Sequence, residues 1–167
     1  GLEKSRRDLT SRATGDVLEL GVGTGLNLPG YDLRAGGAIR SLTAVDISGG
    51  MLNEARTRAD ELGFRAAKPP PVRFVVADVE NLPFPDSTFD CVVDTFSLCV
   101  FEHPETALAE LRRVLKPGGV ALLVEHSRSQ IGPLGAYQDA VAAPVKALAK
   151  GCAWNQDVVG LVEGAGL

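Results

Sequence analysis

An acidic residue followed by three alternate glycines is the first feature of the sequence that could do chemistry. It lies in the stretch VLELGVGTGLNLPGY, residues 17–31, as Glu19, Gly21, Gly23 and Gly25. Glycines at alternate positions let the backbone approach a ligand closely, and their amides can receive a carboxylate. Glu19, at the end of an expected strand, is placed to offset an ammonium. The stretch therefore predicts a small zwitterionic ligand, with a plain strand-to-helix turn as the structural alternative.

A dinucleotide is a poor match for this loop. The dinucleotide fingerprint is GxGxxG, whose third glycine opens a long helix beneath a pyrophosphate. Counting from Gly21 places Leu26 at the third glycine position, and counting from Gly23 places Leu28 there. The Pro-Gly pair at 29–30 then ends the following helix early, which leaves little helix dipole to hold two phosphates. A nicotinamide-dependent oxidoreductase is therefore the weaker alternative.

Two aspartates further along could hold a ribose and a base. Asp46 ends the second expected strand, 21 residues beyond Gly25, and is placed to accept both ribose hydroxyls. Asp78 ends the third expected strand and could receive the exocyclic amine of an adenine. An amino acid, a ribose and an adenine together make S-adenosylmethionine. The structural alternatives are that Asp46 only precedes the helix-start residue Ser48, and that Asp78 only begins the turn DVENLP.

The elements that would position these residues alternate along the chain. Five apolar stretches are expected as strands: residues 16–20, 41–46, 72–78, 89–96 and 119–126. Their apolar runs are nearly continuous, which is typical of parallel strands covered on both faces. Helical patterns lie between them, so the sequence predicts a doubly wound α/β sheet in a single domain over residues 1–167.

The expected helices have clear boundary signals. Ser48 can cap the helix GGMLNEARTRADEL, which Gly63 ends, and Pro104 suits the first turn of PETALAELRRVLK. The inward-facing residues of the first helix are expected to be Met51, Leu52, Ala55, Ala59 and Leu62. Leu108, Leu111, Val114 and Leu115 are the corresponding residues of the second helix, which the Pro-Gly-Gly at 117–119 stops.

The last part of the sequence is helical in pattern. AYQDAVAAPVKALAKG predicts a helix with a break at Pro144, and QDVVGLVEGAGL predicts a second helix capped by Asp157. No further strand pattern follows, so the strand that begins at Gly119 is expected at an edge of the sheet.

Four stretches resemble, in order and spacing, the class I S-adenosylmethionine-dependent methyltransferases: VLELGVGTG, VDISGGMLNEA, ADVENLPFPDSTFD and LRRVLKPGG. Four more are similar to the methyltransferase-like subgroup that is related to ubiquinone/menaquinone-biosynthesis methyltransferases and includes thiol methyltransferases: GTGLNLPGY, DTFSLCVF, EHSRS and GCAWNQD. The resemblance implies a Rossmann-like, mostly parallel sheet. The family's sheet normally has seven strands, so we expect this chain to be truncated before the last two.

The resemblance also implies the activity and the residues that bind the cofactor. The activity would be transfer of a methyl group from S-adenosylmethionine to a small apolar acceptor, such as a thiol, a quinone precursor or a lipid, leaving S-adenosylhomocysteine. Gly21 and Gly23 would pass under the methionine part of the cofactor. The remaining roles would be the ribose for Asp46, adenine packing for Ile47, the adenine edge for Asp78 and Val79, and a place near the sulfonium for Thr95. A non-catalytic scaffold that keeps the cofactor fold is the alternative from a different functional class.

Catalytic residues are harder to assign, because a sulfonium is already an excellent leaving group and positioning can supply much of the acceleration. A general base matters only where the acceptor loses a proton during attack. His126 follows the fifth strand and is the best candidate, with a structural loop histidine as the alternative. His103 is better explained by the start of the Pro104 helix, and Asp94 by a strand end.

Composition limits the partners and the compartment. The net charge of −4 and the pI near 5.2 provide no general attraction for nucleic acid, and the pairs Arg6-Arg7 and Arg112-Arg113 are explained as solvated helix faces. The three cysteines, Cys91, Cys99 and Cys152, form no CxxC pair, so neither a disulfide framework nor a metal site is expected. Cys99 and Cys152 are explained as small hydrophobes, while GCAWNQD could line an acceptor pocket or, with Trp154, cover the core.

No apolar run is long enough to span a membrane, and residues 1–10 are unlike a signal peptide. We therefore expect membrane association only through segments absent from this chain. An intracellular location is expected, in an organelle or at a membrane, and in the cytoplasm if the source is bacterial.

Overall fold

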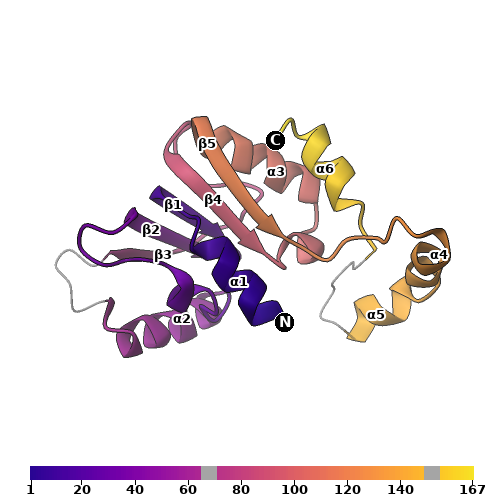
Figure 1. The fold of residues 1–167 in the computed structure, drawn as a ribbon, viewed down its shortest axis with the longest axis horizontal. Coiled ribbons are helices and arrows are strands. Elements are labelled where there is room, and N and C mark those ends of the chain that lie inside the picture. The colour runs from indigo at the N-terminus through magenta and orange to yellow at the C-terminus, as the bar shows by residue number, and fades with distance from the viewer. Residues whose placement is uncertain (65–70, 149–154) are drawn as a thin grey trace.

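The computed structural model describes residues 1–64, 71–148 and 155–167, in which a parallel sheet lies between two layers of helices and the helical segment at 132–148 extends away from the sheet (Figure 1). The strand order is β3-β2-β1-β4-β5, and every neighbouring pair is parallel. The strands are β1 (Gly15–Leu20), β2 (Ile39–Asp46), β3 (Val72–Val76), β4 (Phe89–Thr95) and β5 (Leu115–Val124). The order reverses between β1 and β4, and ligands bind at such a switch point, outside the carboxyl ends of the strands. The predicted α/β class is confirmed, as is the edge position of β5.

Helices cover both faces of the sheet, which explains the nearly continuous apolar strands. On one face lie α1 (Leu2–Thr10) and α2 (Gly49–Glu61), and on the other lie α3 (Pro104–Val114) and α6 (Val158–Gly164). The core under α3 and α6 contains Leu18, Leu20, Val92, Leu108, Leu111 and Val158. The core under α1 and α2 contains Leu9, Val17, Leu42, Ala59, Cys91 and Val93. Alternate residues of β1 and β4 therefore face opposite layers.

All five strands differ from the prediction at one end or both, and the differences in β3 and β5 change the account of the fold. β3 ends at Val76 rather than residue 78, because its partner β2 ends at the paired residue Asp46, so Asp78 lies in the loop that follows. β5 begins at Leu115 rather than Gly119, because residues 115–119 run beside β4 with a register shift. The Pro-Gly-Gly is thus part of an edge strand, where a missing amide is tolerated, and α3 ends at Val114.

The predicted helix boundaries are largely confirmed. Ser48 Oγ accepts the amide of Met51 at 3.3 Å, Asp157 Oδ1 accepts the amide of Gly160 at 3.1 Å, and Pro104 opens α3. The packing stripe of α2 is narrower than expected, because Met51 and Leu62 are each 38% exposed.

The predicted break at Pro144 was wrong. The helical segment after β5 divides at Val141, between α4 (Gly132–Ala140) and α5 (Ala142–Leu148). Pro144 lies in the first turn of α5, where a proline removes no hydrogen bond of the helix.

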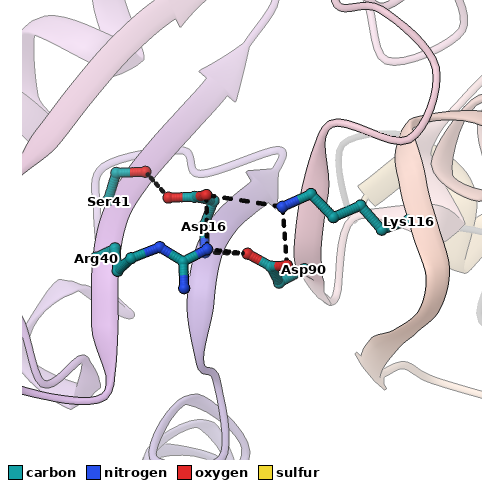
Figure 2. Close-up of polar contacts among 5 residues, drawn as sticks. All are labelled: Asp16, Arg40, Ser41, Asp90 and Lys116. Carbon is teal, nitrogen blue, oxygen red and sulfur yellow. Dashed lines mark hydrogen bonds and ion pairs between the residues drawn. The ribbon is translucent and has the colours of Figure 1, made fainter.

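Charged side chains bind the strands together at the amino-terminal edge of the sheet (Figure 2). The Arg40 guanidinium on β2 contacts the carboxylates of Asp16 on β1 and Asp90 on β4, and Lys116 Nζ on β5 lies 2.9 Å from Asp90 Oδ1. Asp90 Oδ2 also accepts the backbone amide of Asp16 at 2.8 Å. That hydrogen bond, together with Lys116, holds the pKa of Asp90 at about 2. The cluster ties four strands together at the edge opposite the predicted site.

No helix in the described part of the chain is long and apolar enough to cross a membrane. The segments at 65–70 and 149–154 lie outside the described residues, and with them Cys152, Trp154 and most of the KPPPV connector.

Candidate cofactor and active site

A pocket of about 430 Å³ opens at the carboxyl ends of the strands, between the loops that follow β1, β2, β3 and β4. Ligand pockets are commonly of this size and lie at this place in α/β sheets. Its lining includes Gly21, Asp46, Ile47, Asp78 and Val79, all predicted cofactor residues. Residues from four loops are therefore brought to one cavity, and its position at the switch point is that of a cofactor site.

The glycine loop has the backbone conformation that its composition predicts. Gly21, Gly23 and Gly25 all have positive φ, at +55°, +55° and +78°, in the left-handed region that glycine adopts without strain. At Gly21 an added Cβ would stand 2.7 Å from the Cβ of Ser97, and at Gly25 it would stand 2.7 Å from Leu28. At Gly23 it would meet nothing within 4 Å. Gly21 and Gly25 thus permit close packing, whereas Gly23 leaves space beside the backbone.

The amides of this loop are engaged differently from the prediction. The Gly23 amide donates to Asp46 Oδ2 at 2.8 Å, and the Gly25 amide donates to the Val22 carbonyl at 3.0 Å. The expectation that these two amides receive a ligand carboxylate was therefore wrong, because the fold itself uses them.

Asp46 joins the end of β2 to the loop after β1. Its Oδ2 accepts the Gly23 amide, and its Oδ1 accepts the Ser48 amide at 2.8 Å. A carboxylate offers about four acceptor positions, so each oxygen keeps one for another donor. Asp46 lines the pocket as well, so a structural role at the start of α2 and a ribose-binding role are compatible.

The loops after β2 and β3 present the residues predicted for the base. Ile47 is 72% exposed at the pocket, although it is a large aliphatic residue, while Val79 is buried in the core below. Asp78 is exposed, and its Oδ1 accepts the Glu80 amide at 2.9 Å, so it does begin the turn that the structural alternative proposed. The adenine roles of these three residues remain predictions.

Glu19 and Thr95 lie in a buried hydrogen-bond network beside the pocket rather than in its lining. The Asn27 amide nitrogen donates to Glu19 Oε1 at 2.8 Å and to Thr95 Oγ1 at 2.9 Å. Burial raises the pKa of Glu19 to about 7, even though its bond from Asn27 favours the charged form. Beyond Asn27, the buried Tyr31 hydroxyl also interacts with the Glu19 carboxyl and lowers its pKa, but less than burial raises it. Asn27 was not identified from the sequence, where it is an ordinary residue inside the glycine-rich loop.

Arg6 completes this network from α1. Its Nη1 donates to Thr95 Oγ1 at 2.8 Å and to Asn27 Oδ1 at 3.2 Å. Its guanidinium lies over the ring of Phe96, 4.9 Å from the ring centre. The prediction of a solvated helix face for Arg6 was therefore wrong: the residue is half-buried, and its side chain reaches Thr95 at the end of β4.

A second buried group lies below the Ser97 side of the pocket. Ser97 Oγ donates to Asp94 Oδ1, and Glu125 Oε1 accepts the amides of Ser97 and Leu98 at 2.8 and 3.1 Å. Burial and then the neighbouring Glu125 raise the pKa of Asp94 well above its ordinary range, and burial raises that of Glu125. The pair holds the loop after β4 in place, and Asp94 is a buried carboxyl rather than only a strand end.

The two histidines contact different residues near this loop. The exposed His126 ring stands 4.8 Å, centre to centre, from the ring of Phe96, a pocket residue with a φ of +58°. This position keeps His126 as the candidate base. His103 Nδ1 is 2.9 Å from Glu80 Oε2, and that contact raises the pKa of His103. His103 occupies the position before α3 but its side chain makes no cap bond, so its predicted link with the helix start is positional only.

No cluster of three or more metal-binding side chains occurs in the described ranges, and Cys99 is buried there as expected. Three observations show that the cavity and the residues around it suit S-adenosylmethionine. Gly23 leaves open space beside a glycine-only backbone, Asp46 keeps acceptor positions at the pocket, and Ile47 offers an exposed apolar surface for a ring.

The fold and this pocket define a Rossmann-like protein with a nucleoside-sized site at the switch point of its sheet. Residues 18–123 match the family described as "Methyltransferase domain", and the chain belongs to this family. The family implies S-adenosylmethionine as the methyl donor.

Two curated relatives and one solved structure illustrate the relationship. Phosphatidylethanolamine N-methyltransferase of Cereibacter sphaeroides is 40% identical over 128 residues, covering 77% of this chain and 59% of that protein. The ubiquinone/menaquinone biosynthesis C-methyltransferase UbiE of Citrobacter koseri is 39% identical over 124 residues, covering 74% of this chain and 47% of the relative. The YcgJ protein of Bacillus subtilis has the same fold, with a TM-score of 0.78 at 24% identity, covering 98% of this chain and 66% of that one. The matched part of this chain thus spans about half to three-fifths of the two curated relatives.

Proposed function

We propose that this protein binds S-adenosylmethionine across the carboxyl ends of β1, β2 and β3 and transfers its methyl group to a small acceptor with an apolar body. The observation on which the proposal depends is the bond between Gly23 and Asp46, a residue that lines a pocket about 430 Å³ in volume. It places a carboxylate and an open stretch of glycine backbone side by side, as a ribose and the adjoining methionine chain require. Membership of the methyltransferase family supports the cofactor.

The acceptor class that we propose is a lipid amine or a quinone precursor, with a thiol as the third candidate. One relative is named for phosphatidylethanolamine and the other for ubiquinone and menaquinone biosynthesis. The apolar pocket residues Val100 and Phe101 support an acceptor with an apolar part. When bound, the sulfonium supplies an activated methyl, and the residues of this chain would align the acceptor with it and exclude water.

His126 is the base that we propose for an acceptor that must lose a proton. Its ring contacts Phe96, which lines the pocket, so the imidazole lies at the rim rather than in the core. A lipid amine needs such a base only to deprotonate the ammonium, whereas a thiolate needs none. Replacing His126 by Ala should therefore reduce transfer to an amine acceptor more than transfer to a thiol acidic enough to be ionised at the assay pH.

Two measurements test the proposal. Isothermal titration with S-adenosylhomocysteine and with NADH should give saturable binding of the first alone; binding of NADH instead would contradict the cofactor assignment. Tritiated-methyl transfer should then be measured against vesicles containing phosphatidylethanolamine, a demethylated quinone precursor and an alkyl thiol. Cofactor binding without transfer to any of these acceptors would favour the scaffold alternative. In that case Asp46→Ala should abolish cofactor binding but leave binding to a protein partner intact.

A further inference from the structure

The α-carboxylate of the cofactor needs a binding partner, and two amides of the glycine loop are already engaged within the fold. The amides of Gly23 and Gly25 donate within the fold, to Asp46 Oδ2 and to the Val22 carbonyl. The charged residues in the described lining of the pocket are all acidic: Asp46, Asp78, Glu80 and Glu102. A carboxylate placed among them without a cation would be repelled. The described lining of the pocket therefore contains no cationic side chain that could pair with the α-carboxylate of the cofactor.

Arg6 is a cation directed at this end of the sheet. Its guanidinium reaches across from α1 and donates through Nη1 to Thr95 and Asn27, at 2.8 and 3.2 Å. The same group covers the ring of Phe96, which lines the pocket. Nε and Nη2 make no hydrogen bond to any residue in the described part of the chain. Arg6 lines a neighbouring cavity of about 410 Å³ together with Asn27, and it reaches the cofactor pocket through its contact with Phe96. Its position is fixed by Nη1, which leaves Nε and Nη2 as further donors.

Asn27 links this cation to the buried acid. Its Oδ1 accepts from Arg6, and its Nδ2 donates to Glu19 Oε1. A cationic side chain and an acidic side chain are therefore held by the two ends of one small amide group. The Glu19 carboxyl is buried, and the Tyr31 hydroxyl interacts with it besides Asn27. In an α-amino acid the ammonium and the carboxylate are attached to one carbon, so its two charges are also held close together.

We propose that Arg6 binds the α-carboxylate of S-adenosylmethionine through the Nε and Nη2 face of its guanidinium, while Asn27 sets its distance from Glu19. A planar guanidinium pairs with a carboxylate through two parallel hydrogen bonds, which an ammonium side chain does not reproduce. The proposal rests on the cofactor assignment above. It gives α1 a role in recognising the amino acid half of the cofactor, in addition to covering the sheet.

Calorimetric titration with two ligands tests this role. S-Adenosylhomocysteine contains the amino acid, whereas 5′-methylthioadenosine has the same nucleoside and sulfur without it. Arg6→Gln and Arg6→Lys should weaken S-adenosylhomocysteine binding by about ten- to a hundredfold, with Lys the milder change, because a charge-assisted pair is lost or loosened. Binding of 5′-methylthioadenosine should stay within about twofold of the unmodified protein. Arg7→Gln is the matched control, since Arg7 is exposed and pairs with Glu3.

Three other titration results would contradict the proposal, each for a different reason. Unchanged S-adenosylhomocysteine affinity in Arg6→Gln would show that the carboxylate binds elsewhere. An equal loss for both ligands would show that Arg6 only holds α1 and the loop after β4 in place. Because Arg6→Gln keeps a side-chain amide that can donate to Thr95, we expect this variant to stay folded. Its melting temperature shows whether an equal loss of affinity for both ligands comes from unfolding. If the unmodified protein binds neither ligand, the cofactor assignment fails together with this inference, a pattern that differs from the two preceding ones.

Discussion

Asp46 Oδ2 accepts a hydrogen bond from the backbone amide of Gly23 at 2.8 Å, and this contact joins the loops that follow the neighbouring strands β1 and β2. Residue 46 ends β2 and residue 23 lies three positions beyond β1, so parallel pairing of the two strands brings them together. One carboxylate therefore shapes the glycine loop and stands at the pocket.

Removing the Asp46 carboxylate should affect cofactor affinity and stability together. Asp46→Ala leaves the amides of Gly23 and Ser48 without their acceptor, which should cost about 1–3 kcal/mol of unfolding free energy. Affinity for S-adenosylhomocysteine should fall at least tenfold, as measured by calorimetry beside urea unfolding. Glu54→Gln, on the exposed side of α2, is the control and should change neither quantity. Full affinity in Asp46→Ala would remove Asp46 from the ribose site.

Alanine at Gly23 should impair binding more than folding. A positive φ at a residue with a Cβ costs about 1–2 kcal/mol, and no protein atom stands within 4 Å of the new methyl group. The methyl would instead occupy space that we assign to the methionine part of the cofactor. We expect a modest loss of stability with a loss of affinity beyond tenfold. Gly36→Ala, which also has a positive φ and open space, should show the same strain with unchanged binding.

Alanine at Gly25 should impair folding more than cofactor binding. Its Cβ would stand 2.7 Å from Leu28 and 3.3 Å from Ala55 of α2, so the loop and the helix must separate. Backbone strain and overpacking together should cost about 2–4 kcal/mol, visible as a lower urea midpoint with an unchanged slope. A Gly25→Ala protein as stable as Gly49→Ala, where φ is ordinary and the Cβ position is open, would contradict this account of the packing.

Glu19 should make the protein less stable as the pH rises toward neutrality. Burial raises the pKa of Glu19 from 4.5 to about 7, so the folded state binds a proton that the unfolded state has released between these values. Its contribution to stability is therefore fully present below about pH 4.5, declines between pH 4.5 and 7, and is lost above. The decline should be on the order of 3 kcal/mol.

The variant Glu19→Gln isolates this effect, because its side-chain carbonyl can still accept the Asn27 amide. Denaturation of the cofactor-free protein should show the variant more stable than the unmodified protein at pH 8 and equal to it below pH 5. Asp94 and Glu125 have raised pKa values too, so part of the pH dependence should remain in the variant. Identical pH profiles for the two proteins would show that Glu19 stays ionised in the folded state.

Ionised Asp90 should stabilise the folded protein at neutral pH and lose this effect in acid, without any effect on cofactor affinity. Its pKa is lowered from 3.8 to about 2, first by the Asp16 amide and then by Lys116. Its contribution is therefore present above about pH 3.8 and is lost as the pH falls through about 2. Asp90→Asn should lower the unfolding free energy at pH 7 by about 1–2 kcal/mol, since a charged acceptor of a backbone amide is replaced.

The position of Asp90 provides the control for that prediction. The charged cluster of Asp16, Arg40, Asp90 and Lys116 lies at the amino-terminal edge of the sheet (Figure 2), away from the pocket. S-Adenosylhomocysteine affinity at pH 7 should therefore equal that of the unmodified protein. If Asp90→Asn lost as much affinity as Asp46→Ala, the charged cluster at the amino-terminal edge of the sheet would control the geometry of the pocket at the opposite edge.

Much of the fold could be predicted because its signals are local. The positive φ of Gly21 and Gly23, the cap at Ser48 and the parallel strands follow from residue type and apolar patterning within a few positions. The boundaries of β5 could not be predicted in this way. A Pro-Gly-Gly normally ends a helix, and only the free edge beside β4 allows residues 115–119 to extend as a strand.

The candidate site also contains residues that local sequence signals could identify and residues that they could not. Asp46 and Asp78 could be identified from the sequence because strand ends and loop spacing already place them near the switch point. The bond between Arg6 and Thr95 could not, since 89 residues separate them and only the packing of α1 on the sheet brings them into contact.

The sequence by itself determined the alternation of elements, the glycine-only backbone after β1 and the acidic residues that follow the strands. Each of these is fixed by the conformational preferences of a few adjacent residues. Tertiary structure alone decided which loop amides are already engaged, which carboxyls are buried and which arginine reaches the site. Those properties depend on atoms that are far apart in the chain and meet only when helices pack against the sheet.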